Sequence, residues 1–368
     1  MQIGINGNWN LALLEPEALT YLGVQWCKFG HELVDTPEGI AEQCGNTDQV
    51  LDALLALGIE PVIDLRTDAT FVREEAMRTR ATRVGEVPGE ELGRTMFEGV
   101  YVAVADFVRE TVARYSDRCT NWEWWGEPYC PHVTQNMFTA FDYGLSLAAA
   151  YDAAKEADPD CRVWSGGFGV NADFRFIRDV ASAHCPDCGT KADPDHDTCP
   201  QCNAAMDAGA GKKFDICNLH HYAHGRSLES VVAFYDKQLT DLREMLDGPR
   251  CMGQPFASTE WGLPTVPIAK GDIPPWLSSL VLSQGVQAVC EGDAAEWYDA
   301  MLGLFYLHGF ETVCIHTLDD NLPSAKQHWA DYCGLRTRFP LGSGAMLDEP
   351  RWKLHAETVR EWAEKGRS

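Results

Sequence analysis

The sequence has 368 residues, of which 45% are hydrophobic and 23% are charged, so a core of normal size is available and widespread disorder is not expected. The formal net charge of −25 disfavours nucleic acids and anionic membranes, because both are bound by basic surfaces, and it argues against polyanionic substrates. The longest apolar runs are too short to span a membrane, and the N-terminal segment lacks the features of a secretion signal, so we expect a cytoplasmic protein.

A cycle of short apolar run, loop and amphipathic helix recurs about eight times along the chain. The expected strands are short and mostly apolar, as are strands that are buried on both faces of a parallel sheet. They span Gln2–Asn6, Val24–Phe29, Glu60–Leu65, Asn121–Trp125, Arg162–Gly166, Phe214–His220, Pro255–Thr259 and Thr312–His316.

Helices are expected between these strands. The clearest spans Ser227–Leu246, where apolar residues recur at the spacing of one helix face and Ser227 can act as the N-cap. The others span Glu15–Leu22, Asp48–Leu57, Glu98–Tyr115, Thr134–Ala157, Asp173–Ala183, Ala294–His308 and Arg351–Glu364.

Strict alternation of eight strands and helices predicts an α/β fold, a closed (β/α)8 TIM barrel, rather than an open doubly wound sheet. A dinucleotide site is rejected, because Gly4 and Gly7 have the wrong spacing and Trp9 stands where the helix should open. The connections 66–97 and 262–293 are long, and we expect them to shape the end of the barrel where the strands finish.

Two glutamates stand at expected strand ends among aromatic residues. Glu127 belongs to Trp-Glu-Trp-Trp-Gly-Glu-Pro over 122–128, after the fourth strand, and Glu260 to Ser-Thr-Glu-Trp-Gly over 258–262, after the seventh. Glycosidic bond cleavage needs one carboxyl to protonate the leaving oxygen and a second one to attack the anomeric carbon, at about 5–5.5 Å from the first, or to activate water, at about 6.5–9.5 Å. Neighbouring tryptophans would exclude water and offer apolar faces to a sugar. The pair therefore predicts a glycosidase.

These motifs resemble those of glycoside hydrolase clan A, the retaining (β/α)8-barrel glycosidases, and are most similar to its β-xylosidase-like and cellulase-like branches. The likeness runs in order from the first strand to the closing helix. It implies that Glu127 is the general acid/base, that Glu260 is the nucleophile, and that Tyr222 of His-His-Tyr over 220–222 orients Glu260. Contacts to a β-linked neutral saccharide are expected from residues at the strand ends: Asn8, Trp9, Lys28, Trp125, His220, His221, Trp261 and His316.

One position departs from the pattern of the clan. Its members carry Asn before the acid/base, where the amide holds the sugar 2-hydroxyl, whereas this chain has Gly126. Asn8 and Asn218 are candidate replacements, or the substrate presents that hydroxyl differently. The same departure supports an alternative function, in which the chain is a carbohydrate-binding or scaffolding protein on a catalytically weakened barrel.

Four of the 14 cysteines are clustered as two Cys-x-x-Cys pairs, a spacing typical of a zinc ribbon: Cys185, Cys188, Cys199 and Cys202. Four thiolates fill a tetrahedral site, so the zinc is expected to be structural, with iron, disulfides or redox activity as alternatives. The ribbon would span 185–207, inserted between the fifth helix and the sixth strand, and leave 1–184 and 208–368 for the barrel. Its aspartates disfavour nucleic acid, and we expect it to stabilise the chain or contact a neighbouring subunit of a homo-oligomer.

Overall fold

The computed structural model describes the larger part of the chain. The described residues are 1–7, 13, 15–34, 36–67, 89–130, 140–169, 175–184, 191–192, 201, 210–222, 227–249, 251–263, 265–266, 289–318, 333–337 and 351–367.

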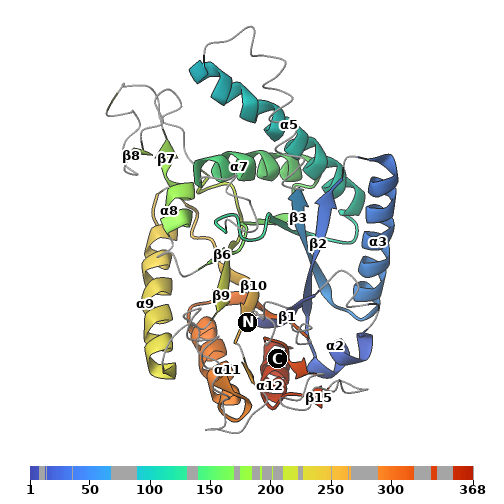
Figure 1. Ribbon diagram of the computed structural model, residues 1–368, viewed down its shortest axis with the longest axis vertical. Coiled ribbons are helices and arrows are strands. Elements are labelled where there is room, and N and C mark those ends of the chain that lie inside the picture. The colour runs from blue at the N-terminus through green and yellow to red at the C-terminus, as the bar shows by residue number, and fades with distance from the viewer. Residues whose placement is uncertain are drawn as a thin grey trace.

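Parallel strands form the centre of the molecule, and helices lie around them (Figure 1). Neighbouring strands are hydrogen-bonded in the order β5-β4-β3-β2-β1-β13-β10-β9-β6. In chain order the strands of this sheet are β1 (Gln2–Asn6), β2 (Trp26–Leu33), β3 (Glu60–Thr67), β4 (Asn121–Trp124), β5 (Arg162–Trp164), β6 (Phe168–Gly169), β9 (Cys217–Tyr222), β10 (Phe256–Gly262) and β13 (Phe310–His316).

The fifth strand of the barrel is split into β5 and β6, and it closes the ring. β5 pairs with β4, whereas β6 pairs with β9 on the other side. Trp164 of β5 also forms a parallel bridge with Ile216, and the backbone N–H of Ser165 donates to the carbonyl of Ile216 at 3.0 Å. The expected α/β barrel is therefore confirmed.

Each of the expected helices has a counterpart among the described residues, with some different boundaries. They are α2 (Pro16–Leu22), α3 (Pro37–Ala56), α5 (Gly89–Tyr115), α7 (Ala140–Ala157), α8 (Arg175–Ala181), α9 (Leu228–Leu246), α11 (Glu291–Leu307) and α12 (His355–Arg367). α9 begins after Ser227, whose hydroxyl accepts from the N–H of Ser230 as predicted. α3 begins earlier than predicted because Thr36 caps it and Pro37 occupies its first turn.

Short strands lie outside the barrel sheet. They are β7 (Ala183–His184) with β8 (Lys191–Ala192), β11 (Thr265–Val266) with β12 (Val289–Cys290), and β14 (Arg336–Thr337) with β15 (Arg351–Trp352). β15 corrects the prediction of a helix from Arg351, since these two residues pair with β14 and α12 starts only at His355. β7 and β8 are antiparallel and lie at the periphery beyond α8 (Figure 1). The four clustered cysteines lie outside the described residues.

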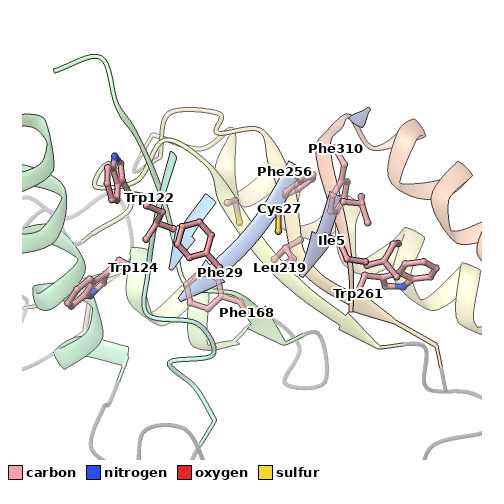
Figure 2. Close-up of a cluster of buried hydrophobic side chains, with 14 of the residues drawn as sticks. Ile5, Cys27, Phe29, Trp122, Trp124, Phe168, Leu219, Phe256, Trp261 and Phe310 are labelled. Carbon is pink, nitrogen blue, oxygen red and sulfur yellow. The ribbon is translucent and has the colours of Figure 1, made fainter. Parts of the chain in front are cut away.

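The two faces of the barrel strands carry different side chains, because successive strand residues point to opposite sides. The outward side chains are large and apolar and pack towards the helices (Figure 2); they include Ile5, Phe29, Trp122, Trp124, Leu219, Phe256, Trp261 and Phe310. A separate apolar layer fills the inside: Trp26, Val62, Trp164, Ile216, Ala257 and Cys314. β1 contributes Gly4 here, where a Cβ would lie only 2.6 Å from the sulfur of Cys314. Among the described helices, none has the length and apolar character needed to cross a membrane.

Candidate active site

Polar and charged side chains replace the apolar ones toward the carboxyl ends of the barrel strands. The strand register sets several of them side by side: Asn6 with His316, Asn6 with Lys28, Asp64 with Glu123, and His220 with Glu260. Because all the strands of the barrel are parallel, these residues gather at one end of it.

Glu127 and Glu260 converge at this end, as predicted from the sequence. One carboxylate oxygen of each and a ring nitrogen of His220 all lie within 4.8 Å of one another. Nδ1 of His220 lies 3.1 Å from Oε1 of Glu127 and 3.6 Å from Oε2 of Glu260. Burial alone would lower the pKa of His220, but the charge of Glu260 and the bond to Glu127 outweigh it and raise the pKa. The separation of the carboxylates fits the short spacing of about 5–5.5 Å that retaining glycosidases use.

Glu260 is held by hydrogen bonds on both of its oxygens. The hydroxyl of Tyr222 donates to Oε1, and Nδ2 of Asn6 donates to Oε2 at 3.1 Å. Burial alone would raise the pKa of Glu260, but His316, His220 and the bond from Tyr222 help to lower it to about 2. Glu260 is therefore a fixed, ionised carboxylate at neutral pH, as a nucleophile requires.

Glu127 is presented by an irregular turn after β4. Both Trp125 and Glu127 have a left-handed backbone, with φ values of 58° and 55°. Such a conformation costs a non-glycine residue roughly 1–2 kcal/mol and concentrates at functional sites. The carboxylate of Glu127 accepts a hydrogen bond from the hydroxyl of Tyr129 at 3.3 Å, and its side chain is 23% exposed.

A layer of buried charges lies beneath the two glutamates. Nζ of Lys28 lies 3.3 Å from Asp64 and 3.1 Å from Glu123, and it donates to the hydroxyl of Thr259 at 3.4 Å. The side chains of Lys28, Asp64 and Glu123 are 2%, 0% and 0% exposed. The prediction that Lys28 contacts the substrate is wrong, because β2 continues to Leu33 and leaves Lys28 inside the barrel.

Only one residue of the histidine pair faces the inside of the barrel. His221 points outward and packs against the rings of Tyr235, Phe305 and Phe310, at centroid distances of 5.3, 5.2 and 5.8 Å. Burial lowers its pKa to about 3, so it is neutral. The prediction of a substrate contact is therefore wrong for His221, whereas His220 and His316 lie beside Glu260.

The tryptophans next to the glutamates are core residues. Trp261 follows Glu260 on the outer face, where its ring lies 4.5 Å from that of Tyr298. Trp125 is 2% exposed and packs edge-to-face on Trp124. Neither offers a face to a sugar, so both predicted contacts are wrong. Asn8 and Trp9, the remaining predicted contacts, lie outside the described residues.

Asn218 cannot replace the side chain that Gly126 lacks. It is fully buried, its Nδ2 donates to the hydroxyl of Thr259 at 2.7 Å, and its Oδ1 accepts from the N–H of Thr259 at 2.9 Å. The space beside Gly126 is instead filled from β3, by Asp64 and Arg66.

Sequence reasoning missed Asn6, Tyr129 and Arg66 as members of the site. Asn6 ends the first expected strand, and Tyr129 follows Glu127 by two residues, so position alone could have drawn attention to both. Arg66 lies just beyond the third expected strand, which ends with its apolar run at Leu65, and so falls in the expected connection 66–97. The observed strand β3 extends further, to Thr67.

The barrel is similar to those of several solved glycosidases. A β-glucosidase from Thermotoga maritima in complex with noeuromycin matches with a TM-score of 0.59 at 12% identity, over 97% of this chain and 87% of that one. The exo-β-1,4-mannosidase Op5Man5 from Opitutaceae bacterium strain TAV5 matches with a TM-score of 0.58 at 15% identity, over 99% of this chain and 59% of that one. The β-glucuronidase of Ruminococcus gnavus gives 0.56 at 12% identity, over 99% of this chain and 50% of that one.

At these identities the likeness concerns the fold alone. The chain spans only about half the length of the glucuronidase and about three fifths of that of the mannosidase. No model of a protein family matches the sequence, and no curated protein is similar to it.

Proposed function

We propose that the chain is a retaining glycoside hydrolase that cleaves β-linked neutral oligosaccharides or glycosides by double displacement. The observation that carries the proposal is the convergence of Glu127 and Glu260, whose carboxylate oxygens lie within 4.8 Å of each other and of His220. Two carboxyls at this spacing can act on the two sides of one acetal carbon. A glycosidase-like barrel supports the same reading.

In the first step, the ionised carboxylate of Glu260 attacks the anomeric carbon and forms an ester bond with it. The bond from that carbon to the leaving oxygen breaks, and the proton of the Glu127 carboxyl moves to the leaving oxygen. Tyr222 and Asn6 each hold one oxygen of Glu260, which fixes its orientation for attack.

In the second step, Glu127, now a carboxylate, removes a proton from a water molecule. The water oxygen bonds to the anomeric carbon, the ester bond to Glu260 breaks, and both glutamates return to their starting states. His220 contacts both carboxyl groups, so it positions them relative to each other.

Two further observations bear on the class of substrate. The similar solved structures are named as a β-glucosidase, a β-glucuronidase and an exo-β-1,4-mannosidase, which favours β-linked sugars. The net charge of −25 favours a neutral saccharide over a polyanionic one.

A structural zinc ion is proposed as a second feature of the chain. Cys185, Cys188, Cys199 and Cys202 would hold it, and four thiolates leave no position for a catalytic water. The antiparallel pairing of His184 with Lys191 places side by side the two residues that flank the first Cys-x-x-Cys pair in the sequence, which supports this proposal. The ion would supply folding free energy to a segment too short for a core of its own.

The test is covalent trapping on a panel of chromogenic β-glycosides. Glu260→Gln should abolish turnover, and a 2-fluoro glycoside should label Glu260 in the wild type. Glu127→Gln should slow glycosides with poor leaving groups most, because they depend on protonation. The control is Glu311→Gln, a partly exposed glutamate that pairs with Arg162 at the other end of the barrel.

Two outcomes would contradict the proposal. An active enzyme that forms no adduct with the fluoro glycoside is not a retaining enzyme. Calorimetric binding of oligosaccharides without release of product would instead favour the carbohydrate-binding or scaffolding alternative.

A further inference from the structure

The space beside Gly126 is occupied by two charged side chains from β3. A Cβ on Gly126 would lie 2.8 Å from Nη2 of Arg66 and 2.8 Å from Oδ2 of Asp64, closer than real Cβ contacts. Because Gly126 directly precedes Glu127, these two side chains lie next to the turn that carries the proposed acid/base. A larger residue at 126 would displace the guanidinium.

The guanidinium of Arg66 is fixed along one edge, and the side chain as a whole is partly exposed. Its Nε donates to Oδ2 of Asp64 at 2.7 Å, and its Nη2 contacts the same oxygen. Asp64 is 0% exposed and is itself held by the N–H of Gly126 at 3.1 Å and by Lys28. The side chain of Arg66 is 36% exposed. An arginine has five N–H groups and no acceptor, so Asp64 leaves donors that can reach a ligand.

Arg66 is also within electrostatic reach of the proposed nucleophile. Asp64 above all, and then Glu123 and Glu260, raise the pKa of Arg66. The anomeric carbon must lie between Glu127 and Glu260. Arg66 lies beside the turn that carries Glu127, and its charge interacts with Glu260, so it is near the ring carbon next to the anomeric carbon. The charge of Arg66 is already offset by Asp64, which suits a neutral hydroxyl better than a carboxylate.

We propose that Arg66 is a substrate-binding residue, and that the N–H groups not used by Asp64 donate to the hydroxyl on the carbon next to the anomeric carbon. The inference rests on the proposed function and names the contact by which the site would recognise its sugar. The guanidinium takes the place of a side chain at 126, which explains why that residue is glycine. The sugar oxygen must accept the hydrogen bond, because Arg66 can only donate.

The test compares two aryl β-glycosides that differ only in this hydroxyl, one of them the 2-deoxy sugar. Wild-type kcat/KM should fall on the order of 10- to 100-fold when the hydroxyl is removed, the range for a hydrogen bond to a charged group. Arg66→Met should lose a similar factor on the hydroxylated substrate and little on the deoxy one, so that the ratio between the two substrates approaches one. Arg66→Lys, which keeps a charged donor, should retain part of the ratio.

Arg162→Met is the matched control, since Arg162 is also 36% exposed and pairs with one acid, Glu311, but lies at the start of β5 at the opposite end of the barrel. It should leave the ratio unchanged. If Arg66→Met does not fold, Gly126→Ala gives the same readout, because its new Cβ would push the guanidinium away.

Equal losses on both substrates in an active enzyme would overturn the assignment of Arg66 and leave it a support for Asp64. A wild type that hydrolyses no glycoside would overturn the proposed function, and this inference with it.

Discussion

Replacing Lys28 with Met tests whether the buried carboxylates beneath the two glutamates depend on its positive charge. Lys28 lies between Asp64 and Glu123 at 3.3 and 3.1 Å, and all three side chains are almost completely buried. Asp64 would keep Arg66 as a partner after the substitution, whereas Glu123 would lose its nearest cation. The cost should therefore fall mainly on Glu123.

The size of the destabilisation depends on how the Glu123 carboxyl responds to the loss of Lys28. Burial already raises the pKa of Glu123 above its ordinary value of 4.5, and the charge of Lys28 opposes that rise. Without Lys28 the carboxyl should take up a proton, which at pH 7 costs up to about 3.4 kcal/mol, at 1.36 kcal/mol per pH unit. The estimate agrees with the roughly 3–5 kcal/mol lost when one partner of a buried ion pair is removed.

The sign of the pH dependence follows from proton linkage. The folded Lys28→Met variant keeps on Glu123 a proton that the folded wild type releases above its own raised pKa. The stability of the variant relative to the wild type should therefore fall as the pH rises through the pKa of Glu123 in the wild type, which lies above 4.5. We expect a destabilisation of about 3 kcal/mol at pH 7 and below about 1 kcal/mol at pH 5.

Urea unfolding at both pH values measures this difference. Lys237→Met is the control, because its ion pair with Asp241 is an i, i+4 contact of a side chain that is 70% exposed and should contribute less than about 0.5 kcal/mol. A loss below about 1 kcal/mol at pH 7, or an equal loss at both pH values, would refute the reasoning that Glu123 depends on Lys28.

Three further predictions concern the site and the cysteines. Tyr222→Phe removes a hydrogen-bond donor that helps to keep the pKa of Glu260 at about 2. The acid limb of the pH profile of kcat/KM should therefore move up by roughly 1–2 pH units, and acid limbs that coincide for variant and wild type would contradict this. His221→Leu should leave kcat/KM within about twofold of the wild-type value. Because the pKa of this buried histidine is about 3, the stability of the variant relative to the wild type should rise as the pH falls from 6.5 towards 5. Thermal melts of both proteins at the two pH values measure this change. A mercurial titration should release about one zinc ion per chain, and removal of the metal should lower the melting temperature while kcat of the folded enzyme persists; a loss of kcat without unfolding would refute a purely structural ion.

The barrel and its glutamate pair could be predicted because both depend on patterns local in sequence. Apolar runs and helix periodicity gave the order of elements, and the carboxyl ends of parallel strands must meet at one end of a barrel. The ends of the strands could be predicted less well. The apolar run of β2 stops near Phe29, which places Lys28 close to an expected strand end, whereas hydrogen bonding with β3 continues to Leu33.

The facing of individual side chains was the main source of error, although the period of two contains the answer. Tyr222 and Glu260 must point inward to meet, so His221 and Trp261, each one position away, must point outward. Both residue types suit a sugar site, but the alternation along the strand decides which of them faces it. Arg66 was beyond local patterns altogether, because its place beside Gly126 depends on contacts between two strands far apart in the chain.

The turn that carries Glu127 links these observations physically. Left-handed backbone at Trp125 and at Glu127 is unfavourable by roughly 1–2 kcal/mol each, and it needs contacts that hold it. Burial of the Trp125 ring provides one such contact, and the bond from the N–H of Gly126 to Asp64 provides another. Asp64 thus holds the backbone beside the proposed acid/base with one oxygen and Arg66 with the other. The geometry of the acid and the donor that we assign to the sugar therefore depend on the same buried carboxylate, so Asp64→Asn should weaken both at once.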